Sequence, residues 1–596
     1  MKKENKKTLI IVESPHKAEK IKEFLGDDYV VLASKGHICD LAKGGKWGIG
    51  IDVKNNFKPH YMLLTDKVNV LENILNAANN ASKIFLMSDP DREGEAISWH
   101  LLERLAGIRV PIKRITVNEI TKKAVVDSIK NSRDIDMKIV HAQETRRFLD
   151  RIVGFTVSPF LMQYFGSNLS AGRVQSVAAR IVIDREEEID AFKPEEYWTL
   201  NVKLKNSDNH SFTAKYEGKL KCKQDCDNTV SQLHNTDFIV ASIDAKDEKK
   251  KPLPPLTTTK LQQLMAKSAN LSPDKTMKSA QWLYENGFCT YIRTDSTRIS
   301  DEALKECRDW LKTNNYSIPK KANIYSASGS AADAHECIRP TDITVEPKNS
   351  QIFSPDDKKV YEAIWKYFVA SQMEPAVYNT LKVKIITKNN KSLEFRASGK
   401  ALASKGFLEI LGINDTSSID IPNLIKGEVL SLSDSKSIFP EQKFTQPPPR
   451  YSESSFIKEL ETREIGRPAT VAEMISKIQS RGYVEKKNNI FYPTDLGKKV
   501  NGILKNIFSF VEINYSAELE KKLDQIADGK LEYLDVLNEF YNNFIKQVNV
   551  AYNNQGATNC DQCGSAQKLL DGKFGKFYVC LNNHKKTFVA DDIANV

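Results

Sequence analysis

Short apolar runs alternate with amphipathic segments over the first 110 residues. The β-branched run Thr8–Val12 predicts a strand. Ser14-Pro15 just after it is typical of a helix start, with serine as the cap and proline in the first turn. Residues 83–88 (KIFLMS) predict a second buried strand, and residues 95–105 (EAISWHLLERL) carry apolar positions at helical spacing. This alternation predicts a βαβ sheet, whose functional loops follow the carboxyl ends of its strands.

The rest of the chain changes pattern several times. Residues 138–194 have helical patterning, and residues 197–243 alternate like strands before the charged segment 244–255 (DAKDEKKKPLPP), which we interpret as a linker. Residues 256–375 are patterned as helices, with the threonines at 257–259 as caps. Residues 378–447 are strand-like up to Pro447-Pro448-Pro449, and residues 458–548 are helical again. The pattern predicts a multidomain protein with α/β, helical and β-rich parts.

Composition narrows the class of protein. The 596 residues include 87 Lys and Arg against 77 Asp and Glu, and this net charge of +10 favours a polyanionic partner. No apolar run approaches the roughly 18 residues that a membrane span needs, and MKKENKKTLIIVES lacks a signal cleavage site, so we expect neither a membrane anchor nor secretion. Nine cysteines without paired spacing indicate a reducing compartment, for which we expect the cytoplasm.

Four carboxylates follow the two predicted strands of the first segment. Glu13 ends the first strand, and Asp89, Asp91 and Glu93 follow the second. Crowded carboxylates repel one another unless a cation joins them, and Mg²⁺ prefers a few carboxylates together with water and phosphate oxygens. The pattern predicts a Mg²⁺ site; the alternative is an acidic turn exposed to solvent.

Tyr291, in NGFCTYIRTDSTRIS, is followed two residues later by Arg293. A phenol with a pKa of about 10 is only about 0.1% ionised at neutral pH, a deficit of roughly 4 kcal/mol for a nucleophile. A nearby guanidinium that pairs with a phosphate offsets such a deficit. Most tyrosines are packing residues, and that alternative stays open for Tyr291 on these grounds alone.

The segments VESPHKAEKI and SDPDREGEAI resemble the TOPRIM domain of type IA DNA topoisomerases, and NGFCTYIRTDSTRIS resembles the active-site motif of that family. The resemblance implies that Tyr291 attacks a DNA strand and becomes joined to its 5′ phosphate, with Arg293 as the phosphate partner. It also implies that Glu13 takes part in proton transfer, that Lys17 contacts the scissile phosphate, and that Asp89, Asp91 and Glu93 hold Mg²⁺ together with Glu13. For Lys17 the alternative is a surface lysine.

Three further stretches resemble the same family. LSAGRVQSVAAR contains Arg173 and Gln175, AHECIRPTD contains His335 and Arg339, and PPPRYSESSFIKELETREIGRPATVAEMI contains Arg450, Ser452 and Arg467. The resemblance implies that His335 supports the active site and that the others contact DNA. The alternatives are a helix start for the first stretch, a packing histidine, and ordinary polar surface residues. YIRTDS and HECIRPT resemble the bacterial topoisomerase I branch; Cys337 is a departure, because alanine is commoner there.

The resemblance also implies a domain organisation. We expect a Rossmann-like TOPRIM domain (1–137), a helical DNA-binding domain in two parts (138–194 and 448–550), a β-rich arch in two parts (195–255 and 376–447) that closes a toroid, and a helical nucleophile domain (256–375). A small C-terminal zinc-ribbon-like module is expected at 557–596. In it Cys560, Cys563, Cys580 and His584 have spacing that favours tetrahedral Zn²⁺. Ribbons of this kind end in a fourth cysteine, so a ribbon that has lost its metal is the alternative. Cys222-x₃-Cys226 has no partner pair and is interpreted as chance.

The function implied by the resemblance is Mg²⁺-dependent relaxation of negatively supercoiled DNA by single-strand cleavage, strand passage and religation. No G-x-x-x-x-G-K-[ST] phosphate loop occurs in the sequence, which agrees with a reaction that needs no ATP. We expect a monomer that acts on single-stranded regions of DNA. The alternatives are a topoisomerase III-like decatenase, a TOPRIM nuclease or primase, and a DNA-binding protein without catalysis.

Overall fold

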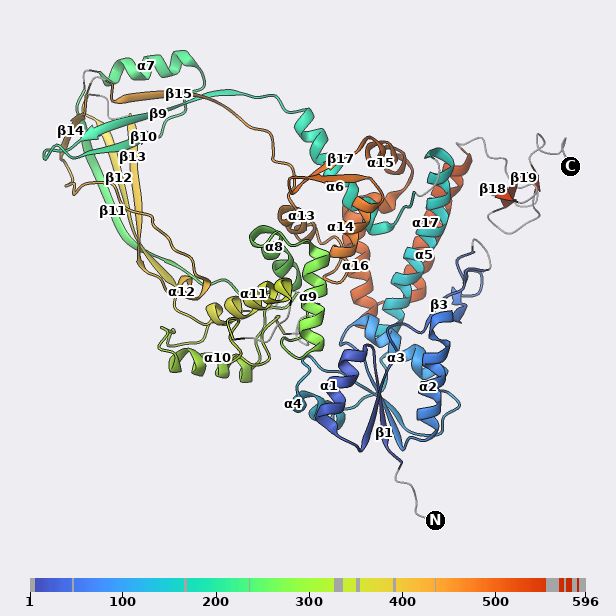
Figure 1. Cartoon of the computed structure of the whole chain (residues 1–596). Helices are drawn as coiled ribbons and strands as arrows, with labels where there is room; N and C mark the ends of the chain where they lie inside the picture. Colours follow the sequence, from blue (N-terminus) through green and yellow to red (C-terminus); the bar gives the residue numbers. More distant parts are fainter. Residues whose placement is uncertain are drawn as a thin grey trace.

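Figure 1 shows the computed structural model of the chain, in which a ring of domains is closed by a β-rich arch. The structure describes residues 6–44, 48–165, 169–234, 236–325, 336–349, 354–389, 393–434 and 436–553, together with the backbone of three short strands between 567 and 588.

A four-stranded parallel sheet forms the core of the N-terminal domain, in the order β2-β1-β7-β8. Alternate residues of β1 (Thr8–Val12) enter different cores: Ile10 and Val12 pack on one face, Leu9 and Ile11 on the other. The predicted strands β1 and β7 (Lys83–Met87) are confirmed, and Ser14 caps α1 (Pro15–Leu25), as expected. The other elements are β2 (Tyr29–Ala33), α2 (Val68–Asn79), α3 (Arg92–Arg104), β8 (Ile112–Ile115) and α4 (Lys122–Lys130), with the small hairpins β3 (Cys39–Leu41)–β6 (Tyr61–Leu63) and β4 (Ile51–Asp52)–β5 (Lys58–Pro59).

Two separate stretches of chain build one helical domain around a shared core. The first stretch gives α5 (Met137–Phe165) and α6 (Arg173–Asp190); the second gives α13 (Glu453–Thr462), α14 (Val471–Ser480), α15 (Asp495–Ile507), α16 (Ile513–Ala527) and α17 (Tyr533–Asn553). The hairpin β16 (Val484–Lys487)–β17 (Ile490–Pro493) interrupts the region that we predicted as helical throughout. Its two-residue turn places Asn488 and Asn489 at positive φ, a conformation that asparagine tolerates.

The arch is a seven-stranded sheet in the order β10-β13-β12-β11-β14-β9-β15. Its strands are β9 (Glu196–Lys205), β10 (Ser211–Tyr216), β11 (Phe238–Lys250), β12 (Ala376–Thr387), β13 (Glu394–Ser404), β14 (Val429–Leu432) and β15 (Ile438–Phe444). The predicted linker is wrong over 244–250, because this charged segment continues β11 and pairs with β12 residue by residue. Backbone pairing leaves its Lys, Asp and Glu side chains exposed, so a strand forms there without buried apolar residues.

The helix α7 (Lys223–Leu233) covers the arch and was not predicted. Cys222 stands at its N-terminal cap position, and Cys226 is buried in the core of the arch beside Leu233. The Cys222-x₃-Cys226 spacing therefore reflects one turn of a helix.

The region predicted as the nucleophile domain contains α8 (Thr258–Ser268), α9 (Pro273–Glu285), α10 (Asp301–Thr313) and α11 (Pro355–Ser371), and the short helix α12 (Leu408–Leu411) packs into the same core. Thr257 caps α8 through the backbone of Lys260, which confirms the predicted cap. Its core continues without a break into the TOPRIM face that holds Ile10 and Val12. Tyr291 therefore belongs to a domain packed directly on the carboxylate-bearing sheet.

The ring in Figure 1 closes because each end of the arch returns to a different domain. Strands β11 and β12 lead to the nucleophile domain, whereas β9 and β15 lead to the helices α6 and α13. A small antiparallel sheet, β18 (Gln567–Gly572), β19 (Gly575–Cys580) and β20 (Thr587–Phe588), follows the last helix.

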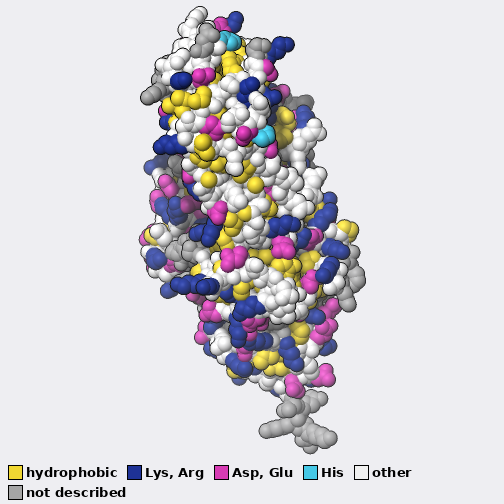
Figure 2. Space-filling view, turned by 90° about the vertical axis from the view of Figure 1, so that its left-hand side faces the viewer, with side chains coloured by type: hydrophobic (Ala, Val, Ile, Leu, Met, Phe, Trp, Pro, Cys, Tyr) yellow, Lys and Arg dark blue, Asp and Glu magenta, His cyan; other side chains and the backbone are white. Residues whose placement is uncertain are grey.

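Figure 2, turned to face the arch, shows cationic side chains mixed with acidic and apolar ones and not gathered in one patch. Within the described residues, no helix combines the length and the apolarity that crossing a membrane requires.

Candidate active site

The functional loops meet at the carboxyl edge of the parallel sheet. Glu13 directly follows β1, and Asp89 lies two residues after β7. The loop after β2 is tied to the same edge, since the Ser34 amide donates to the carbonyl of Val12 and the Gly36 amide to that of Glu13. Adjacent parallel strands thus deliver three loops to one place, as the sequence pattern predicts.

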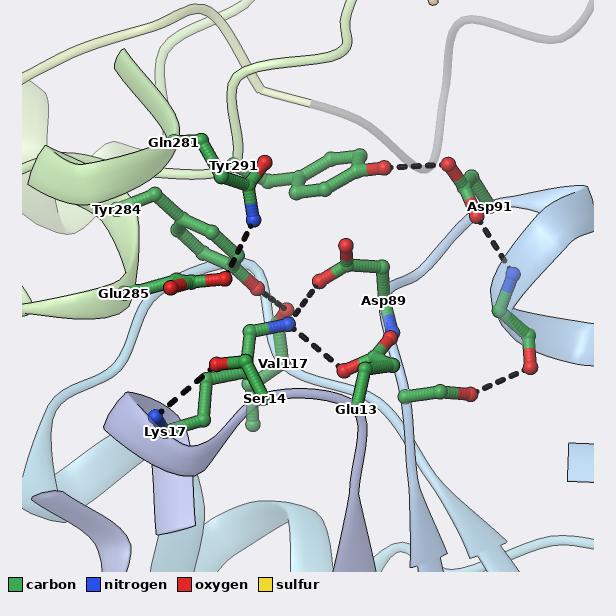
Figure 3. Close-up of polar contacts among 12 residues, drawn as sticks. Glu13, Ser14, Lys17, Asp89, Asp91, Val117, Gln281, Tyr284, Glu285 and Tyr291 are labelled. Carbon is green, nitrogen blue, oxygen red and sulfur yellow. Dashed lines mark hydrogen bonds and ion pairs between the residues drawn. The ribbon is translucent and has the colours of Figure 1, made fainter. Parts of the chain in front are cut away.

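Lys17 joins two of the carboxylates (Figure 3). Its ammonium donates to Glu13 Oε2 at 2.8 Å and to Asp89 Oδ1, and the Asp89 amide donates to the other oxygen of Glu13. Burial alone would lower the pKa of Lys17, but the charges of Asp89 and Glu13 raise it well above its ordinary value. Burial and the charge of Glu13 raise the pKa of Asp89 to about 7 although Lys17 opposes them. Lys17 is therefore a buried partner of the cluster, and its surface-lysine alternative is wrong.

Tyr291 lies on the loop after α9 and reaches across to the TOPRIM domain (Figure 3). Its hydroxyl donates to Asp91 Oδ2 at 2.5 Å, and its amide donates to the carbonyl of Asn118 at 2.7 Å. The ring packs edge-on against Tyr284, with centroids 5.3 Å apart. Burial and the charges of Asp91 and Asp89 raise the pKa of Tyr291 far above its ordinary value. In this conformation the phenol is held neutral, as a donor to Asp91.

Arg293 completes the junction between the two domains. Its guanidinium donates to Glu93 Oε2 at 2.9 Å and lies 3.4 Å from Asp91 Oδ2, the oxygen that accepts the Tyr291 hydroxyl. The structure thus brings together Tyr291, Arg293 and the four predicted carboxylates, from segments 200 or more residues apart. The charge of Arg293 lowers the pKa of Tyr291, but burial and the carboxylates raise this pKa by more.

His37 belongs to the site, although the sequence argument missed it. Its Nε2 lies 3.3 Å from Glu93 Oε1, so His37 and Arg293 engage the two oxygens of one carboxylate from opposite domains. The hydrogen bond from His37, with the charge of Arg293, lowers the pKa of Glu93 to about 2. Only the place of His37 in the chain could have indicated this role, because His37 follows the carboxyl end of β2, a third strand of the same sheet.

Arg114 is a second residue that was missed, and it supports the loop that carries Asp89. It is fully buried in β8 and donates to the carbonyls of Ser88 at 2.9 Å and Asp89 at 2.7 Å. Glu95 accepts from Arg114 at 3.1 Å and also pairs with Arg133. A buried arginine pays a large desolvation cost unless it is paired, so this network fixes the backbone beneath the carboxylates.

The predicted DNA-contact residues are engaged with protein partners in this conformation. Arg339 lies across the junction and donates to Glu119 and Glu336, at 2.9 and 2.8 Å. Arg450 makes a bidentate pair with Glu186, and Ser452 is the N-cap of α13. His335 lies outside the described residues.

Arg173 and Arg467 share a buried carboxylate. Arg173 is the first residue of α6, which confirms the helix-start alternative for its segment, and it pairs with Asp150 and with Glu520 on α16. Gln175 turns back to the carbonyl of Ser170 at 3.1 Å. Arg467 lies 3.4 Å from Glu520 Oε2 and also pairs with Asp524. Arg173 is 1% exposed, so its guanidinium has no open path to a DNA backbone in this conformation.

Glu520→Gln is expected to lower the free energy of unfolding by about 3 kcal/mol, because it removes the buried negative charge that pairs with the buried Arg173 and the partly exposed Arg146 and Arg467. Burial alone would raise the pKa of Glu520, but Arg146, Arg173 and Arg467 lower it to about 2. The wild-type contribution is therefore complete above pH ~4.5 and is lost as pH falls toward 2. Denaturant unfolding at several pH values tests this. Glu518→Gln, an exposed position on the same helix, is the control, and equal stability of the two variants would contradict the prediction.

The acidic cluster has a donor set that suits Mg²⁺. Within the described residues no group of three or more His, Cys, Asp and Glu is arranged as a finished metal site. Mg²⁺ needs only one or two protein carboxylates, with water and substrate phosphate completing its shell. Burial, together with the charge of the neighbouring Glu13, raises the pKa of Asp89. The hard oxygen donors Glu13, Asp89, Asp91 and Glu93 therefore fit such a cation. Of the predicted zinc ligands, Cys560, Cys563 and His584 lie outside the described residues, and Cys580 ends β19.

Comparison with known proteins agrees with this geometry. The sequence model of the DNA topoisomerase family matches residues 134–538, and that of the Toprim domain matches residues 8–120. The chain is similar to the solved structure of full-length topoisomerase I from Thermotoga maritima, with 34% identity, coverage of 98% of each chain and a TM-score of 0.80. The fold, the acidic sheet edge and the tyrosine that faces it all lie within these matches, and the chain belongs to the type IA DNA topoisomerases.

Proposed function

We propose that this topoisomerase relaxes negatively supercoiled DNA through a covalent bond between Tyr291 and a 5′ phosphate. The observation that supports the proposal is the hydrogen bond from the Tyr291 hydroxyl to Asp91, because it joins this hydroxyl to the acidic edge of another domain. A TOPRIM nuclease or primase has no use for a tyrosine at this position.

In the cleavage step, Tyr291 Oη attacks the phosphorus while the bond from phosphorus to the 3′ oxygen breaks. The phenolic proton passes to Asp91, its hydrogen-bond acceptor, and the departing 3′ oxygen takes a proton from the Glu13–Lys17 pair. Arg293 stabilises the charge that develops on the phosphate. Religation reverses each transfer, and because one phosphodiester replaces another, no nucleotide hydrolysis is needed.

Glu13, Asp89, Asp91 and Glu93 would hold Mg²⁺, which supplies positive charge to the phosphate oxygens when bound. In the structure, the protein's own cationic side chains pair with these carboxylates. Lys17 keeps Glu13 and Asp89 together, and Arg293 with His37 orients Glu93. Substrate phosphate has to replace part of this network, since each side chain in it already has a partner.

Strand passage requires the nucleophile domain to leave the TOPRIM domain while Tyr291 keeps one DNA end. The polar contacts across this junction include Tyr291–Asp91, Arg293–Glu93, Arg339–Glu119 and Lys123–Glu302. Ion pairs with partial solvent access are individually weak and re-form readily, so they suit a junction that opens and closes in each cycle.

Plasmid relaxation with Mg²⁺ and without nucleotide tests the proposal. We expect negatively supercoiled plasmid to relax and, after denaturation in mid-reaction, protein to remain attached to DNA 5′ ends. A chain that nicks DNA without a covalent adduct would be a nuclease. Strong decatenation with weak relaxation would favour a topoisomerase III-like activity. We infer further that the enzyme acts as a monomer on single-stranded regions of DNA, in the cytoplasm.

We propose that Cys560, Cys563, Cys580 and His584 bind Zn²⁺, on the support of their spacing alone. Metal analysis of the purified full-length protein should find about one equivalent of zinc, and Cys560→Ala should lose it. Wild-type protein free of zinc would contradict this proposal without affecting the active site.

A further inference from the structure

A cleft of about 660 Å³ lies between the turn that joins α8 to α9 and the hairpin β16–β17. Its lining contains three lysines, Lys267, Lys275 and Lys486, and three asparagines, Asn270, Asn488 and Asn489. No acidic residue is among its lining residues. The cleft therefore offers positive charge and hydrogen-bond donors without a competing carboxylate at its surface.

Two of the three ammonium groups are available to a ligand. Lys486 pairs with the buried Glu453 at 3.0 Å. Lys267 and Lys275 are exposed, and neither forms an ion pair with any residue that the structure describes. In contrast, Lys278, one turn further along α9, pairs with Asp274 at 2.8 Å and does not line the cleft.

The walls of the cleft are fixed by short contacts. The side-chain Nδ2 of Asn489 donates to Asn270 Oδ1 at 2.8 Å and so joins the hairpin of the helical domain to the nucleophile domain. Asn270, Asn488 and Asn489 all have positive φ, so tight turns present them on both walls. The Ser272 side chain caps α9 beside Lys275. One hydrogen bond thus joins the two walls, and local turns and a helix cap shape each of them.

Helix α8 connects the cleft to the nucleophile. At its first turn, the Thr258 hydroxyl donates to the carbonyls of Ile292 and Thr294, on either side of Arg293. Lys267 lies nine residues further along the same helix, roughly 14 Å away at 1.5 Å per residue. The cleft and the loop that carries Tyr291 and Arg293 are therefore at opposite ends of one short helix.

We propose that this cleft binds the phosphate backbone of the DNA strand that Tyr291 cuts. Ammonium and amide groups donate hydrogen bonds to phosphodiester oxygens. Such phosphate contacts position a nucleic acid but do not depend on its base sequence. The proposal rests on the function proposed above. Since the two walls belong to different domains, a strand held here contacts the nucleophile domain and the helical domain at the same time.

Salt dependence of DNA binding tests this proposal directly. Each phosphate contact contributes about 0.7 to the slope of log K against log salt for a single strand. Lys267→Gln/Lys275→Gln in the full-length chain should therefore flatten the slope for a labelled single-stranded oligonucleotide by about 1.4. Lys278→Gln/Lys312→Gln removes the same charge from the same domain at lysines paired with Asp274 and Asp309, and should leave the slope unchanged.

Fluorescence anisotropy without divalent cations measures binding without cleavage, so the result does not depend on whether the enzyme relaxes plasmid. Equal slopes for the two double variants overturn the proposal. A change seen with duplex and not with single strands overturns the assignment to the cut strand. Thermal unfolding verifies that both variants fold; if the first does not, Lys275→Gln alone should flatten the slope by about 0.7.

Discussion

Tyr291→Phe is expected to abolish plasmid relaxation, with a loss of at least about 10⁴-fold, because no other group can take the place of the phenolic oxygen. The substitution removes one oxygen atom from a ring that packs against Tyr284 and keeps the backbone contact to Asn118. The fold should therefore be retained. Relaxation rate and covalent adduct, both followed with Mg²⁺, are the measurements.

Measuring DNA affinity distinguishes a loss of catalysis in Tyr291→Phe from a loss of DNA binding. Affinity for single-stranded DNA should stay within about twofold of wild type, since the hydroxyl faces Asp91 and contributes no positive charge. Residual adduct in Tyr291→Phe would show that another residue is the nucleophile, and the mechanism proposed here would have to be abandoned.

Local patterns in the sequence predicted the parts of this site that are set by neighbouring residues. Strand β1 followed by Glu13, the serine cap of α1 and strand β7 followed by the acidic trio all depend on short-range preferences, and all are found in the structure. Their convergence was predictable because parallel strands place their carboxyl ends together. Tyr291 was predicted as the nucleophile because its motif resembles that of the family. Residue spacing alone would not have distinguished it from the other tyrosines among the twenty in the chain.

The features that were missed depend on partners far away in the chain. Arg173 is buried because Glu520, 347 residues later, lies beside it, and no pattern near residue 173 contains that information. The charged segment 244–250 becomes a strand because β12 supplies its hydrogen bonds. His37 is 56 residues from Glu93 in the sequence and meets it only when β2 joins the sheet. Tertiary pairing, not local preference, decided each of these cases.

The charge balance of the closed site explains why an added cation suits it. With all four ionised, Glu13, Asp89, Asp91 and Glu93 carry −4, and Lys17 with Arg293 returns +2, which leaves −2 before DNA arrives. A phosphodiester adds a further negative charge. Like charges at such short range are costly in a buried setting; burial first, and then the charge of Glu13, raise the pKa of Asp89 to about 7. A divalent cation held by these carboxylates would offset this excess of negative charge.

Asp91→Asn is expected to lower the relaxation rate by on the order of 100-fold or more, because it removes both a proton acceptor and a Mg²⁺ ligand. Asp91 has a second, structural role: its Oδ1 accepts from the Gly94 amide at 2.8 Å and caps α3. Asparagine keeps that acceptor, so Asp91→Asn should retain wild-type stability, whereas Asp91→Ala should lose about 1 kcal/mol as well as activity. Relaxation rates over a Mg²⁺ titration and denaturant unfolding separate the two roles.

The negative charge of Asp91 also raises the pKa of Tyr291. If its only effect were to restrain the nucleophile, Asp91→Asn would be faster than wild type, and that result would contradict the assignment of Asp91 as proton acceptor and metal ligand.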